Sequence, residues 1–112
     1  MSYLHTNQIK WMDMPVDGFT AKELFNHENG TFKAVKLEPK AKYPIHQHAD
    51  KTEYAYVIEG ELEATIGENK YKGVPGSFMT FPVGVKHGLH NPSDSQTILL
   101  IGAVKDLLEL RD

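Results

Sequence analysis

The sequence has no cysteine and a single arginine, Arg111, near its C-terminal end. Without cysteine there is no disulfide, thiolate nucleophile or thiolate metal site, so any bound metal must be held by nitrogen and oxygen atoms. Arginine is the usual bidentate clamp for carboxylates and phosphates, so its scarcity argues against recognition of diacids or sugar phosphates. Lys33 or Lys36, on an early predicted strand, can serve as such a clamp only in part.

Long apolar runs and runs of positive charge are also missing. No segment approaches the roughly 18 consecutive apolar residues of a transmembrane helix, and residues 1–10 are too polar for a signal peptide. The formal net charge is −3, without a Lys/Arg-rich run, which argues against nucleic acid and membrane surfaces as partners. We therefore expect a cytoplasmic protein, and 112 residues fit one domain that spans residues 1–112.

What the sequence does have is a turn residue every few positions. Glycine and proline separate short runs rich in Val, Ile, Thr, Tyr and Phe, which is typical of antiparallel strands. Gly67–Asn69 suits a hairpin turn, and Pro75–Gly76 suits a type II turn. The clearest predicted strands are Thr31–Leu37, Glu53–Glu59, Glu61–Ile66, Ser77–Phe81 and Gln96–Val104. Together they predict an all-β sandwich or barrel of the jelly-roll type.

Two segments leave the secondary structure open. Thr20–Asn26 can form a helical turn capped by Thr20, or a strand. The tail, residues 104–112, can close the barrel as a strand or pack as a short helix.

Three histidines and one glutamate stand out. His46 and His48 lie two residues apart, so on a strand their side chains point to one face. Glu53 follows across a bend, and His87 opens a later strand after the turn at residues 82–84. In a barrel interior these side chains can converge, and three imidazoles with one carboxylate suit Fe, Mn, Co, Ni, Cu or Zn. Four ligands leave two positions of a six-coordinate ion open, as in a catalytic site.

The four residues belong to two longer motifs. The first covers residues 46–60 (His46-x-His48-x4-Glu53-x6-Gly60), and the second covers residues 76–91 (Gly76-x5-Pro82-x-Gly84-x2-His87-x3-Asn91). At these nine positions the chain resembles the cupin superfamily, and specifically its small, single-domain microbial members of the cupin 2 type. One position departs from the pattern, because Lys40 stands where the first motif begins with glycine, and this puts the local turn in question.

The resemblance implies an all-β fold, a single cupin (jelly-roll) β-barrel. It also implies one divalent transition metal ion (Fe, Mn, Ni, Cu or Zn), with His46, His48, Glu53 and His87 as its ligands. No catalytic acid or base is evident in the sequence.

Strand alternation predicts the surroundings of the site. The parity that turns Glu53 inward also turns Ala55 and Val57 inward, while Tyr54, Tyr56 and Ile58 face outward, into packing or a dimer interface. His90, three residues after His87, should face away from the site. Trp11 and Met12–Met14 should cover the barrel or a partner subunit. The expected pocket-lining residues are Ala55, Val57, Met79, Phe81 and Leu89, and Phe78 is expected in the core.

Three functions fit these features. We favour a metal-dependent enzyme on a small organic substrate, with dioxygenase-like carbon–carbon cleavage ahead of isomerase or decarboxylase chemistry, because the pocket is apolar and lacks arginine. The alternative is a non-enzymatic, metal-dependent ligand-binding or sensing module that acts with a partner protein, as in zinc-dependent anti-sigma factors, whose cupin half the segment from Trp11 through the first motif also resembles. A barrel that the metal merely braces is the least favoured. We expect a homodimer, since barrel edges and exposed aromatics favour pairing.

Overall fold

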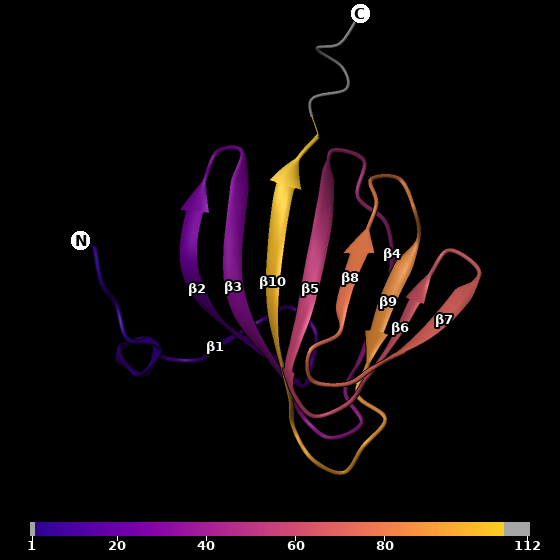
Figure 1. Cartoon of the computed structure of the whole chain (residues 1–112), viewed down its shortest axis with the longest axis horizontal. Coiled ribbons are helices and arrows are strands. Elements are labelled where there is room, and N and C mark those ends of the chain that lie inside the picture. Colours follow the sequence, from indigo (N-terminus) through magenta and orange to yellow (C-terminus); the bar gives the residue numbers. More distant parts are fainter. Residues whose placement is uncertain (1, 107–112) are drawn as a thin grey trace, which may run out of the picture.

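In the computed structural model, which describes residues 2–106, short antiparallel strands follow one another along the chain (Figure 1). A short 3₁₀ helix, η1 (Thr6–Gln8), precedes them. The strands are β1 (Met12–Asp13), β2 (Phe19–His27), β3 (Gly30–Leu37), β4 (Lys42–His46), β5 (Lys51–Glu59), β6 (Leu62–Ile66), β7 (Asn69–Gly73), β8 (Phe78–Phe81), β9 (His87–His90) and β10 (Thr97–Lys105). Within residues 2–106 no helix is long and apolar enough to cross a membrane.

The strands form two antiparallel sheets. One has the order β1-β2-β3-β10-β5-β8, and the other has the order β4-β9-β6-β7. β10 returns to lie between β3 and β5, so strands distant in sequence become neighbours in the larger sheet. From β3 to β6, and again from β7 to β10, consecutive strands alternate between the two sheets. This arrangement confirms the predicted all-β jelly-roll fold.

The predicted strands agree with the observed ones to within two residues at each end. The open segment Thr20–Asn26 is a strand and lies inside β2, where it pairs with β3. In the tail, β10 continues as a strand to Lys105, and residues 107–112 lie outside the described residues.

The predicted turns are present. Gly67 and Glu68 join β6 to β7, and Gly76 has a φ of 97° in a turn that the Ser77 N–H closes onto the Val74 carbonyl at 2.8 Å. Lys40 has a φ of 65° and is the one non-glycine residue with positive φ among residues 2–106. At the position where the motif has glycine, Lys40 therefore takes a left-handed backbone conformation, which glycine adopts without a steric penalty.

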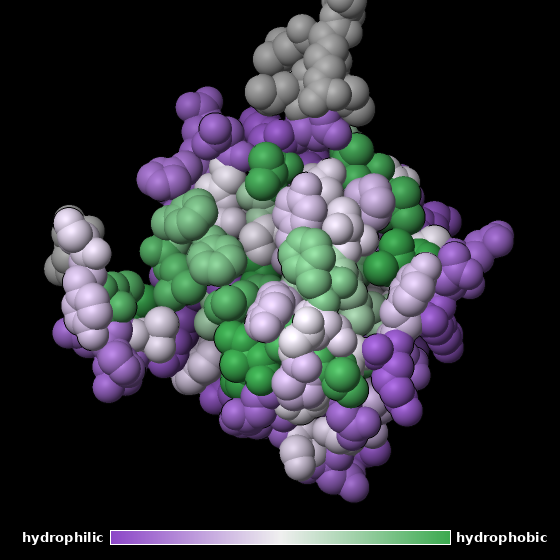
Figure 2. All heavy atoms as spheres, viewed as in Figure 1, coloured by the Kyte–Doolittle hydropathy of each residue, from purple (hydrophilic) through white to green (hydrophobic). Residues whose placement is uncertain are grey.

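The core lies between the two sheets, with Val35, Leu37, Val57, Leu62 and Leu99 among its fully buried side chains. In the view of Figure 2, apolar surface gathers in the middle of the molecule and hydrophilic surface surrounds it. Tyr56, Ile58 and Phe78 are exposed. For Tyr56 and Ile58 the outward direction agrees with their predicted parity, whereas the prediction of Phe78 as a core residue was wrong, because β8 turns its alternate residues, Met79 and Phe81, inward.

Candidate metal centre

The structure brings His46, His48, Glu53 and His87 together from three strands and a loop. His46 ends β4, His48 lies in the loop after it, Glu53 lies in β5, and His87 begins β9. One ligand atom from each of the four side chains lies within 4.8 Å of the others. β4 and β9 pair directly, with His46 opposite His87, which places these two rings 4.3 Å apart between centroids. The two sheets thus hold the cluster from opposite sides.

His48 reaches the cluster by a different route from the predicted one. β4 ends at His46, so strand alternation does not set the direction of the His48 side chain. Instead, the Gly84 N–H donates a hydrogen bond of 2.7 Å to the His48 carbonyl and fixes the loop. The His46 and His48 rings are then 5.0 Å apart between centroids.

Hydrogen bonds to the backbone orient two of the imidazoles. His46 Nδ1 lies 2.8 Å from the Pro44 carbonyl oxygen, and His87 Nδ1 lies 3.1 Å from the Val85 carbonyl oxygen. Because a carbonyl oxygen only accepts, each Nδ1 carries the proton, and each Nε2 of the neutral ring offers a lone pair. Such backbone contacts fix the tautomer and the ring orientation of metal-binding histidines.

The carboxylate of Glu53 lies between two of these imidazoles. Its Oε1 atom is 3.1 Å from His48 Nε2 and 3.2 Å from His87 Nε2. A carboxylate oxygen and a neutral Nε2 both offer lone pairs, so at these distances they need a proton or a cation between them. A divalent cation satisfies all of these donor atoms at once, and the three nitrogens and one oxygen suit a first-row transition metal. The residues therefore fit the predicted metal, and their role as its ligands stays a prediction.

The electrostatics of the metal-free cluster favour the protonation states that a metal requires. Burial raises the pKa of Glu53, but the side-chain hydrogen bond with His87, when a proton lies between the two groups, and the positive charges of protonated His48 and of Lys51 outweigh it, so the pKa lies below its ordinary value. Burial also lowers the pKa of His48, and the neighbouring Lys51 and histidines add to this effect against the opposing charge of Glu53. An ionised carboxylate and a neutral imidazole are the forms that bind metal ions.

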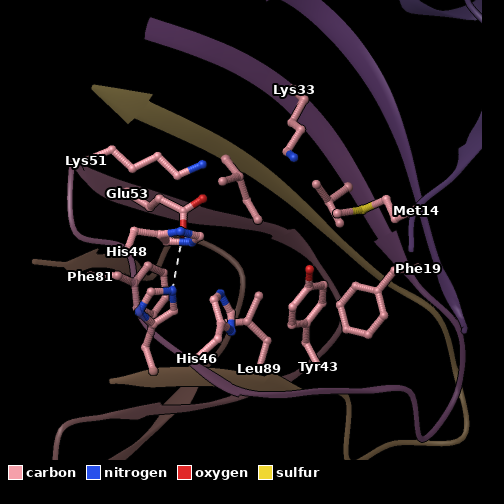
Figure 3. A pocket seen from close by; sticks show the side chains of 13 residues that line it. Met14, Phe19, Lys33, Tyr43, His46, His48, Lys51, Glu53, Phe81 and Leu89 are labelled. Atoms are coloured by element: carbon pink, nitrogen blue, oxygen red, sulfur yellow. Dashed lines mark hydrogen bonds and ion pairs between the residues drawn. The ribbon is translucent and has the colours of Figure 1, made fainter. Parts of the chain in front are cut away.

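The cluster opens into a cavity of about 120 Å³ between the sheets (Figure 3). Of the predicted pocket-lining residues, Phe81 and Leu89 line this cavity, but Ala55, Val57 and Met79 do not. These three point inward, as their parity predicts, yet they lie in the packed core. The prediction was wrong for them because parity selects a face of the sheet, whereas the cavity occupies only one end of the space between the sheets.

Several lining residues were not among the predicted ones. Met14 reaches the cavity from the segment after β1, although we expected Met12–Met14 to cover the barrel or a partner subunit. Phe19, Val35 and Ile101 supply apolar wall. Tyr43 lies beside His46, with ring centroids 4.8 Å apart, because an irregularity in the β4–β9 pairing turns both side chains inward. Lys33 and Lys51 also line the cavity. Lys33 shares the parity of Val35 and Leu37, a signal already present in the sequence.

The remaining histidine of the second motif lies outside the cavity. His90 Nδ1 is 3.7 Å from Glu63 Oε1, on the outer side of the smaller sheet beside Lys42 and Ile45. This position agrees with the direction that strand parity predicts for His90.

Comparisons with known proteins agree with this fold. A family model described as "Cupin domain" matches residues 33–102. A search of curated protein sequences found no relative. Solved structures that resemble the chain include the cupin domain of Schizosaccharomyces pombe Cnp3, with 15% identity, a TM-score of 0.85, and coverage of 96% of this chain and 77% of that one.

Two further similar structures come from bacteria with different described activities. A predicted oxalate decarboxylase from Thermotoga maritima has 17% identity and a TM-score of 0.84, over 92% of this chain and 98% of that one. The polyketide cyclase RemF from Streptomyces resistomycificus has 19% identity and a TM-score of 0.82, over 93% and 79%. At these identities the likeness concerns the fold, which supports many chemistries.

Proposed function

The chain belongs to the cupin-domain family, and we propose that it is a metal-dependent enzyme on a small organic substrate. It would bind one divalent transition metal ion through His46, His48, Glu53 and His87. The observation that carries the proposal is the position of the cluster. Its four ligand atoms lie together at the wall of a cavity, not inside a closed shell of protein. A metal that only braces a fold needs no such access.

A bound metal ion would supply Lewis-acid or electron-transfer chemistry at the wall of the cavity. The chain's own residues have separate tasks. The backbone contacts of His46 and His87 keep their Nε2 atoms directed at one point, and the ionised Glu53 lowers the net charge of the loaded site. Phe19, Phe81 and Leu89 keep the substrate side of the site apolar and limit the access of water.

Among reaction types we favour dioxygenase-like cleavage of a carbon–carbon bond, because apolar side chains form much of the wall. The alternative is a metal-dependent binding or sensing module. The experiment below identifies the metal and distinguishes this alternative from the enzyme. The homodimer and the cytoplasmic location stay predictions. The exposed Tyr56, Ile58 and Phe78 are available for contacts between copies.

The test is the metal content of untagged protein, purified without a nickel column and measured by mass spectrometry. We expect about one equivalent of metal in the wild type. In His48→Ala the affinity should fall by more than about 100-fold, since even loss of an outer hydrogen-bond partner of a ligand costs roughly 10- to 100-fold. His90→Ala is the matched control, because His90 lies outside the cavity and should leave the metal content unchanged.

The possible results distinguish the dioxygenase from the sensing module and test metal binding itself. Absence of metal from the wild type, even after addition of Fe(II), Mn(II) or Zn(II), contradicts the proposal. Oxygen consumption with small diketones that requires Fe(II) and disappears in His48→Ala supports the dioxygenase. Stoichiometric zinc without turnover, together with a stable complex with another protein, would instead favour the sensing module.

A further inference from the structure

We propose that the cavity beside the metal centre binds a small carboxylate, and that Lys33 and Lys51 hold its anionic end. The inference rests on the proposed function, because the carboxylate would be the substrate or ligand of the same site. It also gives these two lysines a role that the cluster of metal-binding side chains does not explain.

The two lysines reach the cavity from neighbouring parts of the larger sheet. Lys33 lies in β3 and Lys51 begins β5, and β10 runs between these two strands. Figure 3 shows both side chains extending toward the cavity, with the Lys51 ammonium beside Glu53 and the Lys33 ammonium above the Tyr43 hydroxyl. An anion in the cavity therefore faces a cation on one wall and a hydroxyl group on the other.

Neither ammonium group has a hydrogen bond or an ion pair with another residue of the described chain, 2–106. Glu53 acts on Lys51 through its electrostatic field. However, Glu53 Oε1 is already shared between His48 and His87. Glu23 lies opposite Lys33 in the β2–β3 pairing, but no ion pair between them is found among residues 2–106. Cationic groups that face a partly enclosed cavity without a partner gain most from an anionic ligand, because charge-assisted hydrogen bonds are the strong ones.

The charge of the cavity is opposite to that of the molecule. The formal net charge of the chain is −3, but the charged residues that line the cavity are Lys33, Lys51 and Glu53. With neutral histidines these give a net charge of +1, and a divalent ion raises it to +3. A low-dielectric cavity with this sign attracts anions although the molecule as a whole repels them.

The volume of the cavity and the apolar side chains of its wall limit which anions can bind. Its volume of about 120 Å³ is well below the roughly 300–1,000 Å³ of pockets for drug-sized ligands, so the ligand is small. Phe19, Leu89 and Ile101 offer a short carbon skeleton an apolar wall. Phosphate groups favour arginine, which residues 2–106 lack. A short-chain carboxylate, such as a 2-oxo acid, meets these conditions.

Lys36 provides a matched comparison on the same strand. Its parity is opposite to that of Lys33, and its ammonium lies 4.6 Å from the centroid of the Trp11 ring, outside the cavity. Lys33→Met and Lys36→Met therefore remove the same charge from β3, and only the first removes it from the cavity.

The experiment measures binding of pyruvate and acetate, with the neutral amides pyruvamide and acetamide as isosteric probes. Calorimetry and NMR titrations use Zn(II)-loaded and metal-free protein at low ionic strength. We expect Lys33→Met and Lys51→Met each to weaken carboxylate binding by about 10- to 100-fold, the range for one hydrogen bond to a charged group. Lys36→Met should change it by less than about twofold, and the amides should bind poorly to every variant.

A titration with Zn(II) alone, run on each variant, separates this inference from the proposed function. If the wild type binds zinc but neither carboxylate, or if the amides bind as well as the acids, the inference is overturned. An equal loss in Lys36→Met, or preferential binding of inorganic phosphate, overturns it as well. If the wild type binds no metal and the metal-free protein still binds a carboxylate through Lys33 and Lys51, the inference stands and the metal-centre proposal falls.

Discussion

The two ends of β9 carry residues of the same sequence motif in opposite chemical situations. His87 begins the strand beside the cavity, and Asn91 follows its other end in a buried loop. Both side chains are polar and nearly inaccessible to solvent. The side-chain amide of Asn91 forms its hydrogen bonds with other groups of the protein. The Nε2 atom of His87 faces a carboxylate and two other imidazoles, a set that a cation completes.

Asn91 fastens three segments to one another. Its Nδ2 lies 3.2 Å from the Leu37 carbonyl, 3.1 Å from the Glu38 carbonyl and 2.7 Å from the Ser95 carbonyl. Its Oδ1 accepts hydrogen bonds from the backbone N–H and the hydroxyl group of Ser93. A polar group that is satisfied in this way contributes to stability and has no capacity left for a ligand.

The comparison indicates how a motif residue can be assigned to folding or to chemistry. A buried polar side chain with a complete set of protein partners fixes the fold. One whose lone pairs converge on a shared point beside a cavity serves a ligand. The following variants test this division, from the largest expected effect to the smallest.

Asn91→Ala should cause the largest loss of stability. It removes the amide donor from the Leu37, Glu38 and Ser95 carbonyls and the acceptor from the Ser93 N–H. The Glu38 carbonyl keeps the Ala41 N–H as a donor and the Ser95 carbonyl keeps the Ser93 hydroxyl, so the cost comes from the remaining groups, at roughly 1–3 kcal/mol each. We expect the free energy of unfolding to fall by about 3 kcal/mol and Tm to fall by about 10–20 °C. Urea unfolding and thermal melting of the metal-free protein measure the change.

The control for this prediction is the affinity for metal at a temperature where Asn91→Ala is folded. Since Asn91 lies beyond the far end of β9 from His87, the affinity should equal that of the wild type. His48→Ala should show the reverse pattern, with metal affinity lost and the Tm of the metal-free protein little changed. A similar loss of metal affinity in both variants would show that the division between the two ends is wrong.

The sequence predicted the four residues of the cluster, because their spacing matches a family motif. It did not predict how His48 reaches them. Alternation assumes a strand that continues, but β4 ends at His46, and the hydrogen bond from Gly84 then sets the position of His48. That contact joins residues distant in sequence, and no local pattern encodes it.

The cavity wall shows a second limit. Val57 and Lys33 both have the inward parity of their strands, but Val57 is packed between the sheets and Lys33 faces open space. The difference depends on where the sheets diverge, which is a property of their twist and packing and not of a single strand. The sequence thus predicts the inward face of each strand, whereas the depth of a residue between the sheets requires the structure.

Lowering the pH should affect the metal cluster at the His87 end of β9 but not the hydrogen-bond network of Asn91 at the other end. In the fold His48 favours its neutral form and Glu53 its ionised form, since both pKa values are lowered. As the pH falls through about 6.5 and then about 4.5, the ordinary values for the two residues, the unfolded chain takes up protons first, and the metal-free protein loses stability. The stability that these groups contribute is complete above these values.

Urea unfolding of the metal-free protein at pH 7, 5.5 and 4 measures this effect. We expect Asn91→Ala to keep the pH dependence of the wild type at a lower overall stability, because its network contains no titratable group. Glu53→Gln should have a flatter profile at the acid end. Identical profiles for Glu53→Gln and the wild type would mean that Glu53 contributes nothing to the acid sensitivity.

The smallest effect is expected at Lys40, which contacts the loop after Asn91 and lies away from the metal cluster. Lys40 donates to the Pro92 carbonyl at 2.6 Å and lies 3.6 Å from Asp94, so it supports the loop that follows Asn91. Its left-handed backbone costs a non-glycine residue roughly 1–2 kcal/mol, whereas an ion pair this exposed contributes between about 0 and 1 kcal/mol. Lys40→Gly should therefore raise stability by about 0.5 kcal/mol, or Tm by about 2–4 °C.

Lys40→Ala is the matched variant, because alanine loses the same side-chain contacts and keeps the Cβ atom that makes a φ of 65° unfavourable. It should lower Tm slightly while Lys40→Gly raises it, and neither should alter metal affinity. Melting curves of the two variants measure the contrast directly. If both lower Tm equally, the contacts of Lys40 outweigh its backbone strain. In that case the loop after Asn91 depends on the lysine side chain as well as on the asparagine network.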